Sequence, residues 1–263
     1  MMAFRALGAT RSGDNLLLQS LPRLTAARLR AVLEPMSMAA GEMIAAPGTP
    51  IARVVFPTGS VVSTVLRMAD GEGVEVGLTG REGVVGGWLA FPDVRAGHDF
   101  IVQIAGTALV MDADAFTAQL RGDPALSDAV LRWMQAGMNA MAQFTGCNRL
   151  HPVNERYARW LLMAHDRVQG DNFHLTQEYA SQMLGVRRAS VTLVAGELSS
   201  AGLISYHRGD VRIVDREGLE DAACECYGAV NDEAQRLLGY DVRKQATTRA
   251  KLRAHGDGAA HAQ

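Results

Sequence analysis

Residues 175–186 read LTQEYASQMLGV, and residues 187–198 continue as RRASVTLVAGEL. In the first segment the apolar side chains recur at helical spacing as far as Gly185, and glycine readily adopts the left-handed turn that separates two helices. The apolar face of the second segment consists of Val191, Val194, Ala195 and Leu198. The pattern predicts two short helices joined by a glycine turn, which is the helix-turn-helix unit.

A short β-hairpin is predicted directly after the second helix. Gly202 ends that helix, and the strand-like runs LISY at 203–206 and VRIV at 211–214 flank a turn at 208–210. Two helices with a glycine turn also occur as an ordinary packed hairpin, so it is the following hairpin, or wing, that favours a DNA-binding unit. An exposed helix start with arginines and hydroxyls can enter a major groove and contact base edges and phosphates.

The chain as a whole has the composition of a globular protein. Its 263 residues are 48% hydrophobic and 21% charged, enough for one large or two modest domains. The net charge is −2, and residues 151–215 hold as many basic as acidic side chains, so affinity for DNA must come from the positions of the positive groups and from helix N-termini.

Targeting signals and a disulfide framework are not expected. No apolar run is long enough to cross a bilayer, and no apolar signal core follows Arg5. Three cysteines, Cys147, Cys224 and Cys226, do not suggest a disulfide framework. We therefore expect a cytoplasmic protein without a membrane partner.

The N-terminal half is predicted to be a β-roll. Residues 14–33 have a helical pattern, and from about residue 36 to residue 111 short Val- and Ile-rich runs alternate with glycines. Asp70-Gly71 is a good hairpin turn. Several short strands at this spacing indicate a β-sandwich or barrel-like roll, to which we assign residues 14–122.

A long helix is predicted over residues 123–150. Asp123-Pro124 has the form of an N-cap followed by proline at the first helical position. Apolar residues then recur at spacings of four and three, as in a coiled coil, which favours a homodimer; the alternative is a helix packed on its own β-domain. The predicted dimer seam consists of Val130, Met134, Gly137, Met141 and Phe144.

The remaining chain follows a break. His151-Pro152 ends the long helix and is the expected hinge, and residues 151–230 are assigned as the winged helix-turn-helix domain. After Leu238 the composition becomes polar and small, so residues 241–263 are predicted to be a flexible tail.

The order of β-roll, long helix, hinge and winged helix-turn-helix resembles the CRP/FNR family of bacterial transcription regulators over roughly residues 15–230. The most specific matches are LTQE at 175–178, LGVRRASVT at 184–192 and AGLI at 201–204. The resemblance implies an α+β fold with an N-terminal β-roll of the cyclic-nucleotide-binding type, a dimerisation helix and a C-terminal winged helix-turn-helix.

The resemblance also implies a set of DNA contacts. Arg188 matches the family's base-reading arginine, which can bond guanine O6 and N7 together. Ser190 and Gln177 match phosphate-contacting positions, and Asn154 a backbone contact near the hinge. The full set of expected DNA-binding residues is Thr176, Gln177, Arg187, Arg188, Ser190, Thr192, Asn154 and, on the wing, Arg208. The sequence departs from the family at Ala189, where an acidic reader is common, and at Leu193, which is often basic.

The cyclic-nucleotide cassette of the family is degenerate in this chain. The corresponding stretch, residues 81–91, has Gly87 or Trp88 where a ribose-binding glutamate is expected, and Arg95 is out of register with the phosphate-binding arginine. We expect no cyclic AMP binding in the usual mode. Gly86, Gly87 and Trp88 are the candidate residues for another, unidentified small-molecule effector; the alternative is that Trp88 fills the core.

Metal and catalytic chemistry are not predicted. No cysteine precedes Cys147, so the N-terminal iron–sulfur ligands of some family members are missing, and a lone His98 in the β-domain does not indicate haem. Cys224 and Cys226 are expected to point to different sides of a helix, one buried and one partly exposed, with no second ligand pair for zinc. With no catalytic or phosphate-loop motif present, we predict neither an enzyme nor a cofactor or metal.

The resulting prediction is a homodimeric, sequence-specific transcription regulator that binds a palindromic operator in double-stranded DNA. RNA polymerase is a further candidate partner. The alternative hypothesis is a signalling or scaffold protein that uses the β-roll for a ligand or protein partner, for which the near-neutral DNA domain is the best support.

Overall fold

The computed structural model describes residues 15–92, 94–168 and 170–243. Its N-terminal part is a β-roll of two antiparallel sheets, with strand orders β1-β7-β3 and β2-β6-β4-β5. The strands are β1 (Glu34–Met38), β2 (Met43–Ala45), β3 (Arg53–Pro57), β4 (Val61–Arg67), β5 (Gly73–Thr79), β6 (Asp99–Ile104) and β7 (Gly106–Asp112). The predicted hairpin at Asp70-Gly71 joins β4 and β5, and Gly71 has the positive φ of 89° that such a turn requires.

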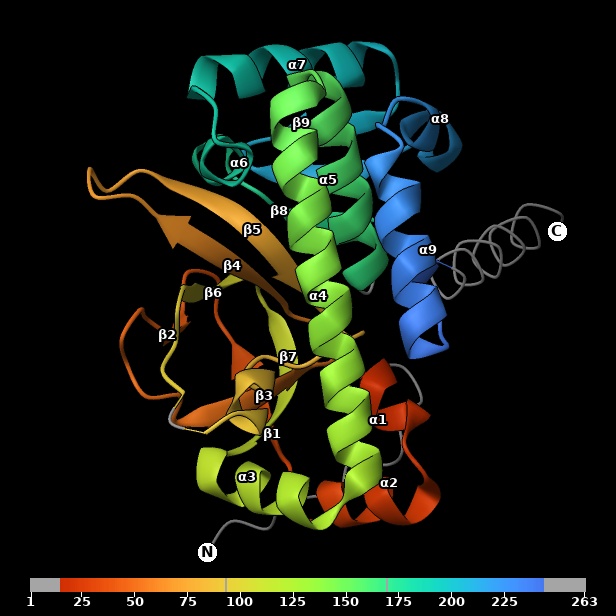
Figure 1. Ribbon diagram of the computed structural model, residues 1–263. Helices are drawn as coiled ribbons and strands as arrows, with labels where there is room; N and C mark the ends of the chain where they lie inside the picture. Colours follow the sequence, from red (N-terminus) through yellow and green to blue (C-terminus); the bar gives the residue numbers. More distant parts are fainter. Residues whose placement is uncertain (1–14, 93, 169, 244–263) are drawn as a thin grey trace, which may run out of the picture.

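Short helices close the lower end of the roll (Figure 1). They are α1 (Leu16–Ser20), α2 (Arg23–Arg30) and α3 (Ala113–Gly122), and the 3₁₀ turn η1 (Gly87–Ala90) lies within the degenerate cassette. The helical pattern predicted over 14–33 therefore forms two helices instead of one, because Pro22 starts a new helix; residue 14 itself lies outside the described residues.

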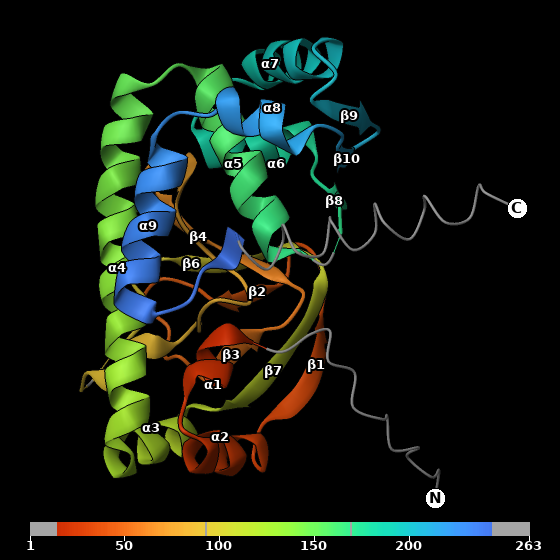
Figure 2. The same ribbon diagram turned by 90° about the vertical axis from the view of Figure 1, so that its right-hand side faces the viewer.

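The long helix α4 (Pro124–Leu150) runs along the whole molecule (Figures 1 and 2). Asp123 caps it as predicted, with its Oδ1 accepting hydrogen bonds from the backbone N–H groups of Ala125 at 3.0 Å and Leu126 at 3.3 Å. A further helix, α9 (Cys226–Leu238), runs beside α4; a helix was expected at Cys224 and Cys226, but neither its length nor its packing on α4 was predicted.

The predicted seam of α4 faces the protein's own interior. Val130 and Met134 belong to the core below the roll, and Phe144 belongs to the core that continues into the C-terminal part. Gly137 and Met141 are half-buried beside them. The β-roll and α9 cover this stripe, so these five residues are not available to a second α4 helix, and the predicted register of the seam is wrong. The large apolar side chains that α4 exposes are Leu131, Met138 and, at its C-terminal end, Leu150.

The C-terminal part has the predicted winged-helix order with one additional strand. Its elements are α5 (Val153–Arg167), β8 (Asn172–His174), α6 (Gln177–Leu184), α7 (Arg188–Ser200), β9 (Ile204–His207), β10 (Asp210–Ile213) and α8 (Arg216–Asp221). β9 and β10 form the wing, and β8 pairs with β10 on its other edge. The predicted tail at 241–263 lies mostly outside the described residues, which end at 243.

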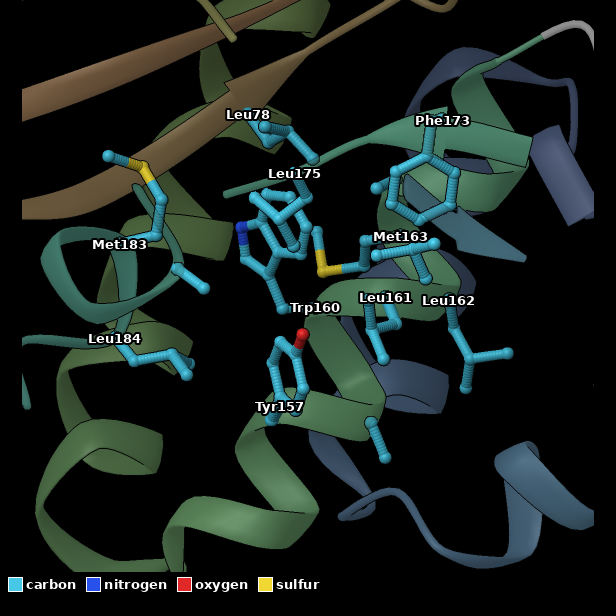
Figure 3. Packing of buried hydrophobic residues seen from close by; sticks show 14 of the residues in the cluster. Leu78, Tyr157, Trp160, Leu161, Leu162, Met163, Phe173, Leu175, Met183 and Leu184 are labelled. Atoms are coloured by element: carbon cyan, nitrogen blue, oxygen red, sulfur yellow. The ribbon is translucent and has the colours of Figure 1, made fainter. Parts of the chain in front are cut away.

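The β-roll and the winged helix share one hydrophobic core, which Figure 3 shows from close by. The side chains of α5 from Arg156 to Arg167 are all buried, and Trp160 lies among Leu78 of the roll and Leu175 and Met183 of the helix-turn-helix. Its indole N–H donates a hydrogen bond of 2.8 Å to Glu75 of β5. His151-Pro152 thus ends α4, but the two regions that it separates in the sequence are packed together.

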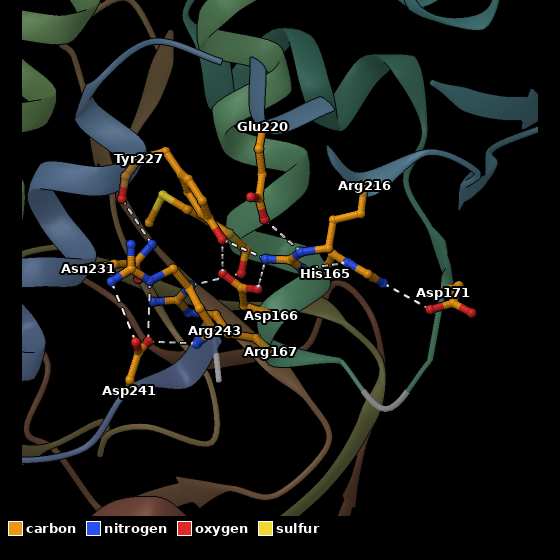
Figure 4. A network of polar contacts seen from close by, with 11 residues as sticks. His165, Asp166, Arg167, Asp171, Arg216, Glu220, Tyr227, Asn231, Asp241 and Arg243 are labelled. Carbon is orange, nitrogen blue, oxygen red and sulfur yellow. Dashed lines mark hydrogen bonds and ion pairs between the residues drawn. The ribbon is translucent and has the colours of Figure 1, made fainter. Parts of the chain in front are cut away.

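Polar contacts hold the C-terminal helices on α5 (Figure 4). The buried Asp166 accepts hydrogen bonds from Arg216 of α8 at 2.7 Å and from the hydroxyl of Tyr227 of α9 at 2.8 Å. Arg216 also pairs with Glu220 one turn further along α8. These contacts fix α8 and α9 relative to α5 of the winged-helix region. Among the described residues no helix is both long and apolar enough to cross a membrane.

Candidate nucleic-acid interface

The helix-turn-helix has the local geometry that its sequence predicts. Thr176 caps α6, with its hydroxyl oxygen accepting a hydrogen bond from the Tyr179 N–H at 3.2 Å. Gly185 has a φ of 61°, the left-handed conformation that ends α6 and turns the chain towards α7. Arg187 is the N-cap of α7, and its side chain makes no capping hydrogen bond.

The N-terminus of α7 is therefore open to a ligand from solvent. The first N–H groups of a helix have no acceptor within the helix, and together with the helix dipole they favour a negatively charged group such as a phosphate. Arg187 and Arg188 are both exposed at this end. In Figures 1 and 2, α7 lies across one end of the molecule, away from the β-roll.

Most of the predicted contact residues surround the junction of α6 and α7. Thr192 is exposed on the next turn of α7, and its hydroxyl donates a hydrogen bond of 2.9 Å to Gln177 Oε1. Thr176, Gln177 and Ser190 are half-buried. Asn154 is exposed in the first turn of α5, which lies at the same end of the molecule as α7 in Figure 2.

Arg208 lies on the wing. It has a φ of 49°, and with Gly209 at 91° it forms the tight turn between β9 and β10. The Tyr206 hydroxyl donates a hydrogen bond of 3.0 Å to the Leu175 carbonyl oxygen, which ties the wing to the start of the helix-turn-helix. The exposed Arg208 side chain is therefore carried by a wing that is fixed to the DNA-binding unit.

The two departures from the family pattern lie on the exposed surface of α7. Ala189 is exposed beside Arg188, and Leu193 is 65% exposed one turn further on. Neither side chain can donate or accept a hydrogen bond at a base edge. On this face of α7 Arg188 is accordingly the residue with the strongest hydrogen-bonding capacity.

The sequence of residues 155–222 matches the family of Crp-like helix-turn-helix domains. A search among curated proteins finds no match to the chain. Three solved structures share its architecture at low sequence identity. FixK2 from Bradyrhizobium japonicum is 14% identical, with a TM-score of 0.61 over 73% of this chain and 98% of that protein.

Two further structures of similar fold belong to transcription regulators. A protein from Eubacterium rectale assigned to the Crp/Fnr family of transcriptional regulators is 13% identical, with a TM-score of 0.59 over 78% of this chain and 96% of that one. A transcriptional regulator of the CRP family from Thermus thermophilus is 18% identical, with a TM-score of 0.57 over 79% of this chain and 98% of that one.

The matched domain is a DNA-binding helix-turn-helix of the Crp type, and over its longer span the chain shares the fold of solved structures of CRP/FNR-family transcription regulators. The resemblance drawn from the sequence is confirmed at that level, by domain family over residues 155–222 and by fold over the longer span.

The cassette residues of the β-roll line a small cavity beneath α4. Gly86, Gly87 and Trp88 contribute to its wall, together with Met134 and Met141 of α4, and its volume is about 90 Å³. A Cβ atom at Gly87 would lie 3.3 Å from Val130 Cγ1, so the cassette is packed closely on α4. Trp88 is half-buried and packs against the cores on both sides of it.

Charged and polar side chains at the edge of this cavity are paired with one another. Arg167 of α5 donates a hydrogen bond of 2.8 Å from Nε to Glu82 Oε1, and both side chains are buried. The Tyr240 hydroxyl donates to the Glu82 carbonyl oxygen at 2.7 Å, so the chain after α9 covers the cavity on that side.

A second cluster of potential ligands lies at the end of α4. Cys147, His151, Cys224 and Cys226 each place one ligand atom so that all four atoms lie within 4.8 Å of one another. The hydrogen bond with the Cys224 thiol, together with nearby Arg159, lowers the pKa of Cys147 to about 5. Among the described residues, these four bring together the donor atoms that a metal ion could bind.

The convergence of these four side chains was not predicted from the sequence. Both Cys224 and Cys226 are buried, so the expectation of one partly exposed thiol is wrong, and Cys147 with His151 supplies the second ligand pair that the sequence analysis found lacking. The spacing of four residues between Cys147 and His151, one helical turn, was the available signal. It went unrecognised because nothing in the sequence showed that α9 begins beside the end of α4.

Proposed function

We propose that two copies of the chain bind a palindromic DNA site, each reading one half-site with α7. The observation that carries this proposal is the open N-terminus of α7, where Arg187 and Arg188 are exposed beside hydroxyl and amide side chains. Arg188 would make the base contact, and Arg187, Ser190, Gln177, Thr176 and Thr192 would bind phosphates or adjacent groups. Asn154 and Arg208 would extend the phosphate contacts on either side.

The exposed face of α4 is the proposed dimer interface. Leu131 is 47% exposed and Met138 is 60% exposed, and these large apolar side chains lie two helical turns apart on the same face. Gln135, Ala142 and Thr145 continue that row at spacings of three and four, all of them exposed. Pairing of two α4 helices along it would place the two α7 helices in successive major grooves, about 34 Å apart.

The effector is proposed to differ from cyclic AMP in its usual binding mode. An apolar cavity of about 150 Å³ can hold a molecule as small as benzene, whereas the cavity between the roll and α4 has about 90 Å³. A cyclic nucleotide would also bring a phosphate charge, which needs a partner when buried, and Arg167 is held by Glu82. We propose that another small molecule, which would enlarge the cavity near Gly86, Gly87 and Trp88, acts as the effector. RNA polymerase is a further proposed partner.

Selection of duplexes from a random pool tests the proposed function. The full chain should enrich an inverted repeat with half-site centres one helical turn apart, and binding should weaken steeply with salt, because phosphate contacts release counterions. Enrichment of no recurring sequence, with a monomer in solution scattering, would overturn the proposal. Binding of a protein partner that persists at high salt would favour a scaffold function, to which the near-neutral charge of the DNA-binding unit points.

A further inference from the structure

Four side chains from two distant parts of the chain converge at the end of α4. Cys147 lies in its last turn and His151 is its C-cap, while Cys224 lies just before α9 and Cys226 is its first residue. Cys147 Sγ lies 3.5 Å from Cys224 Sγ, and Cys226 Sγ lies 3.6 Å from His151 Nδ1. The three cysteines are at most 4% exposed and form a small cluster of their own, separate from the large apolar cores.

These distances are those of a tetrahedral metal site. Zn²⁺ with Zn–S bonds of about 2.3 Å and Zn–N bonds of about 2.0 Å places two sulfur atoms about 3.8 Å apart, and a sulfur and a nitrogen about 3.5 Å apart. All four ligand atoms lie within 4.8 Å of one another, which leaves room for one ion at the centre of the cluster. Three cysteines and one histidine are a common ligand set of structural zinc sites.

The groups around the cluster suit a bound cation with three thiolate ligands. His151 Nε2 lies 3.1 Å from Glu225 Oε1, so a carboxylate holds the imidazole with Nδ1 directed at the cluster. The Gln143 side-chain amide donates to Cys226 Sγ at 3.1 Å. The guanidinium groups of Arg156 and Arg159 interact electrostatically with Cys147, and they would offset the one net negative charge that three thiolates and Zn²⁺ leave.

We propose that Cys147, His151, Cys224 and Cys226 form a mononuclear Zn²⁺ site that fastens the end of the long helix α4 to the start of α9. The ion would bridge the ends of the winged-helix segment, since Cys147 and His151 lie at the end of α4 and Cys224 and Cys226 lie at the start of α9. Zn²⁺ fits better than an iron–sulfur cluster, whose several iron atoms would have to be bound by ligand atoms set further apart. A Cys147–Cys224 disulfide is the competing use of the same sulfur atoms.

Metal analysis of the full chain, purified under reducing conditions, tests this proposal directly. We expect one Zn²⁺ per chain with a dissociation constant in the nanomolar range or tighter. Co²⁺ added to the reduced, metal-free protein should give the visible absorption of tetrahedral thiolate ligation, saturate at one equivalent and be displaced by Zn²⁺. Because this titration uses the wild-type chain, it does not depend on whether a variant folds.

Variants then assign the ligands. Cys226→Ser and His151→Ala should lose the bound Zn²⁺, whereas His207→Ala, at an exposed histidine of the wing, should keep it. Glu225→Ala removes a side chain that is 76% exposed and leaves all four ligands in place. We expect it to lower the Zn²⁺ affinity by about 10- to 100-fold, as the loss of a group that orients a histidine ligand does.

The proposal is overturned if the reduced wild-type chain takes up neither Zn²⁺ nor Co²⁺, or if metal uptake is the same in the Cys226 and His207 variants. A Cys147–Cys224 disulfide in a protein that binds no metal after reduction would likewise overturn it. None of these measurements involves DNA, so their failure and the failure of the proposed DNA function are distinguishable.

Discussion

Arg188 stands at the first position of α7, where its exposed positive charge can enter a groove. Arg188→Ala should weaken binding to the selected operator by about 1–3 kcal/mol and relax its specificity at one base pair per half-site, because a bidentate contact with guanine discriminates against other bases. Titration of the operator and of its single-base variants measures both effects.

The neighbouring arginine provides the matched control. Arg187→Ala should weaken binding to all sequences alike and reduce the salt dependence, as the loss of a phosphate contact does. If Arg188→Ala left operator specificity unchanged, the assignment of the base contact to position 188 would be wrong.

Buried and exposed arginines differ in what they contribute to stability. Arg216 pairs with Asp166, whose side chain is fully buried, whereas Arg236 pairs with Glu233 on the open surface of α9. Arg216→Leu would leave a buried carboxylate without its cation and should lower the free energy of unfolding by roughly 3 kcal/mol. Arg236→Leu should change it by less than about 1 kcal/mol.

Denaturant unfolding of the two variants beside the wild type measures the difference. Equal effects of the two substitutions would show that Asp166 is compensated by other groups, among which the Tyr227 hydroxyl already donates a hydrogen bond to it.

At the scale of the elements, the helix-turn-helix was predictable and the role of α4 was not. Thr176, Gly185 and the apolar faces of α6 and α7 are local signals, readable within a dozen residues. The side of α4 that contacts the core depends instead on α9 and the roll, which are distant in sequence. A heptad pattern indicates that one stripe of a helix is buried, but it does not indicate whether a second chain or the same chain covers that stripe.

The exposed stripe of α4 gives a test of the proposed dimer. Met138→Glu should shift the chain towards the monomer in sedimentation or scattering and weaken operator binding, because it places charges in an apolar interface. Leu24→Glu, at a position of α2 that is 81% exposed, should leave the dimer intact. A dimer unaffected by Met138→Glu would place the interface elsewhere.

The proximity of the four proposed metal ligands could not be predicted from the sequence for the same reason. Cys147 and His151 are one turn apart at the end of α4, and Cys224 and Cys226 are close in sequence, so each pair is a local pattern. Their convergence depends on the packing of α9 beside α4, which no local pattern reveals. In each half of the site the sequence offers only two ligands, fewer than a metal site usually needs.

At the scale of the whole molecule, a buried carboxyl joins the β-roll to the winged helix. Burial raises the pKa of Glu75 to about 7, against the hydrogen bonds from Ser63 and Trp160. Since the unfolded value is near 4.5, the folded chain binds this proton more tightly between pH 4.5 and about 7. This contribution to stability is complete below pH 4.5 and is lost as the pH rises to about 7, by at most about 3 kcal/mol.

Glu75→Gln keeps the acceptor for Trp160 and removes the charge. The variant should match the wild type near pH 5 and be the more stable of the two at pH 8, as measured by urea unfolding at both values. A wild-type stability with the same pH dependence as that of the variant would contradict the assignment. Ser63→Ala is a useful companion, because it removes one hydrogen bond and leaves the carboxyl in place.

The turn of the helix-turn-helix rests directly on the β4–β5 hairpin. A Cβ atom at Gly185 would lie 3.3 Å from Val74 Cγ2, and one at Gly73 would lie 3.1 Å from the Gln182 amide nitrogen. The β4–β5 hairpin of the roll and helix α6 therefore pack directly against each other. A stimulus that displaces this hairpin by the width of a methyl group would therefore shift α6 directly, and with it the α7 helix that follows Gly185. No other part of the protein would have to transmit the movement.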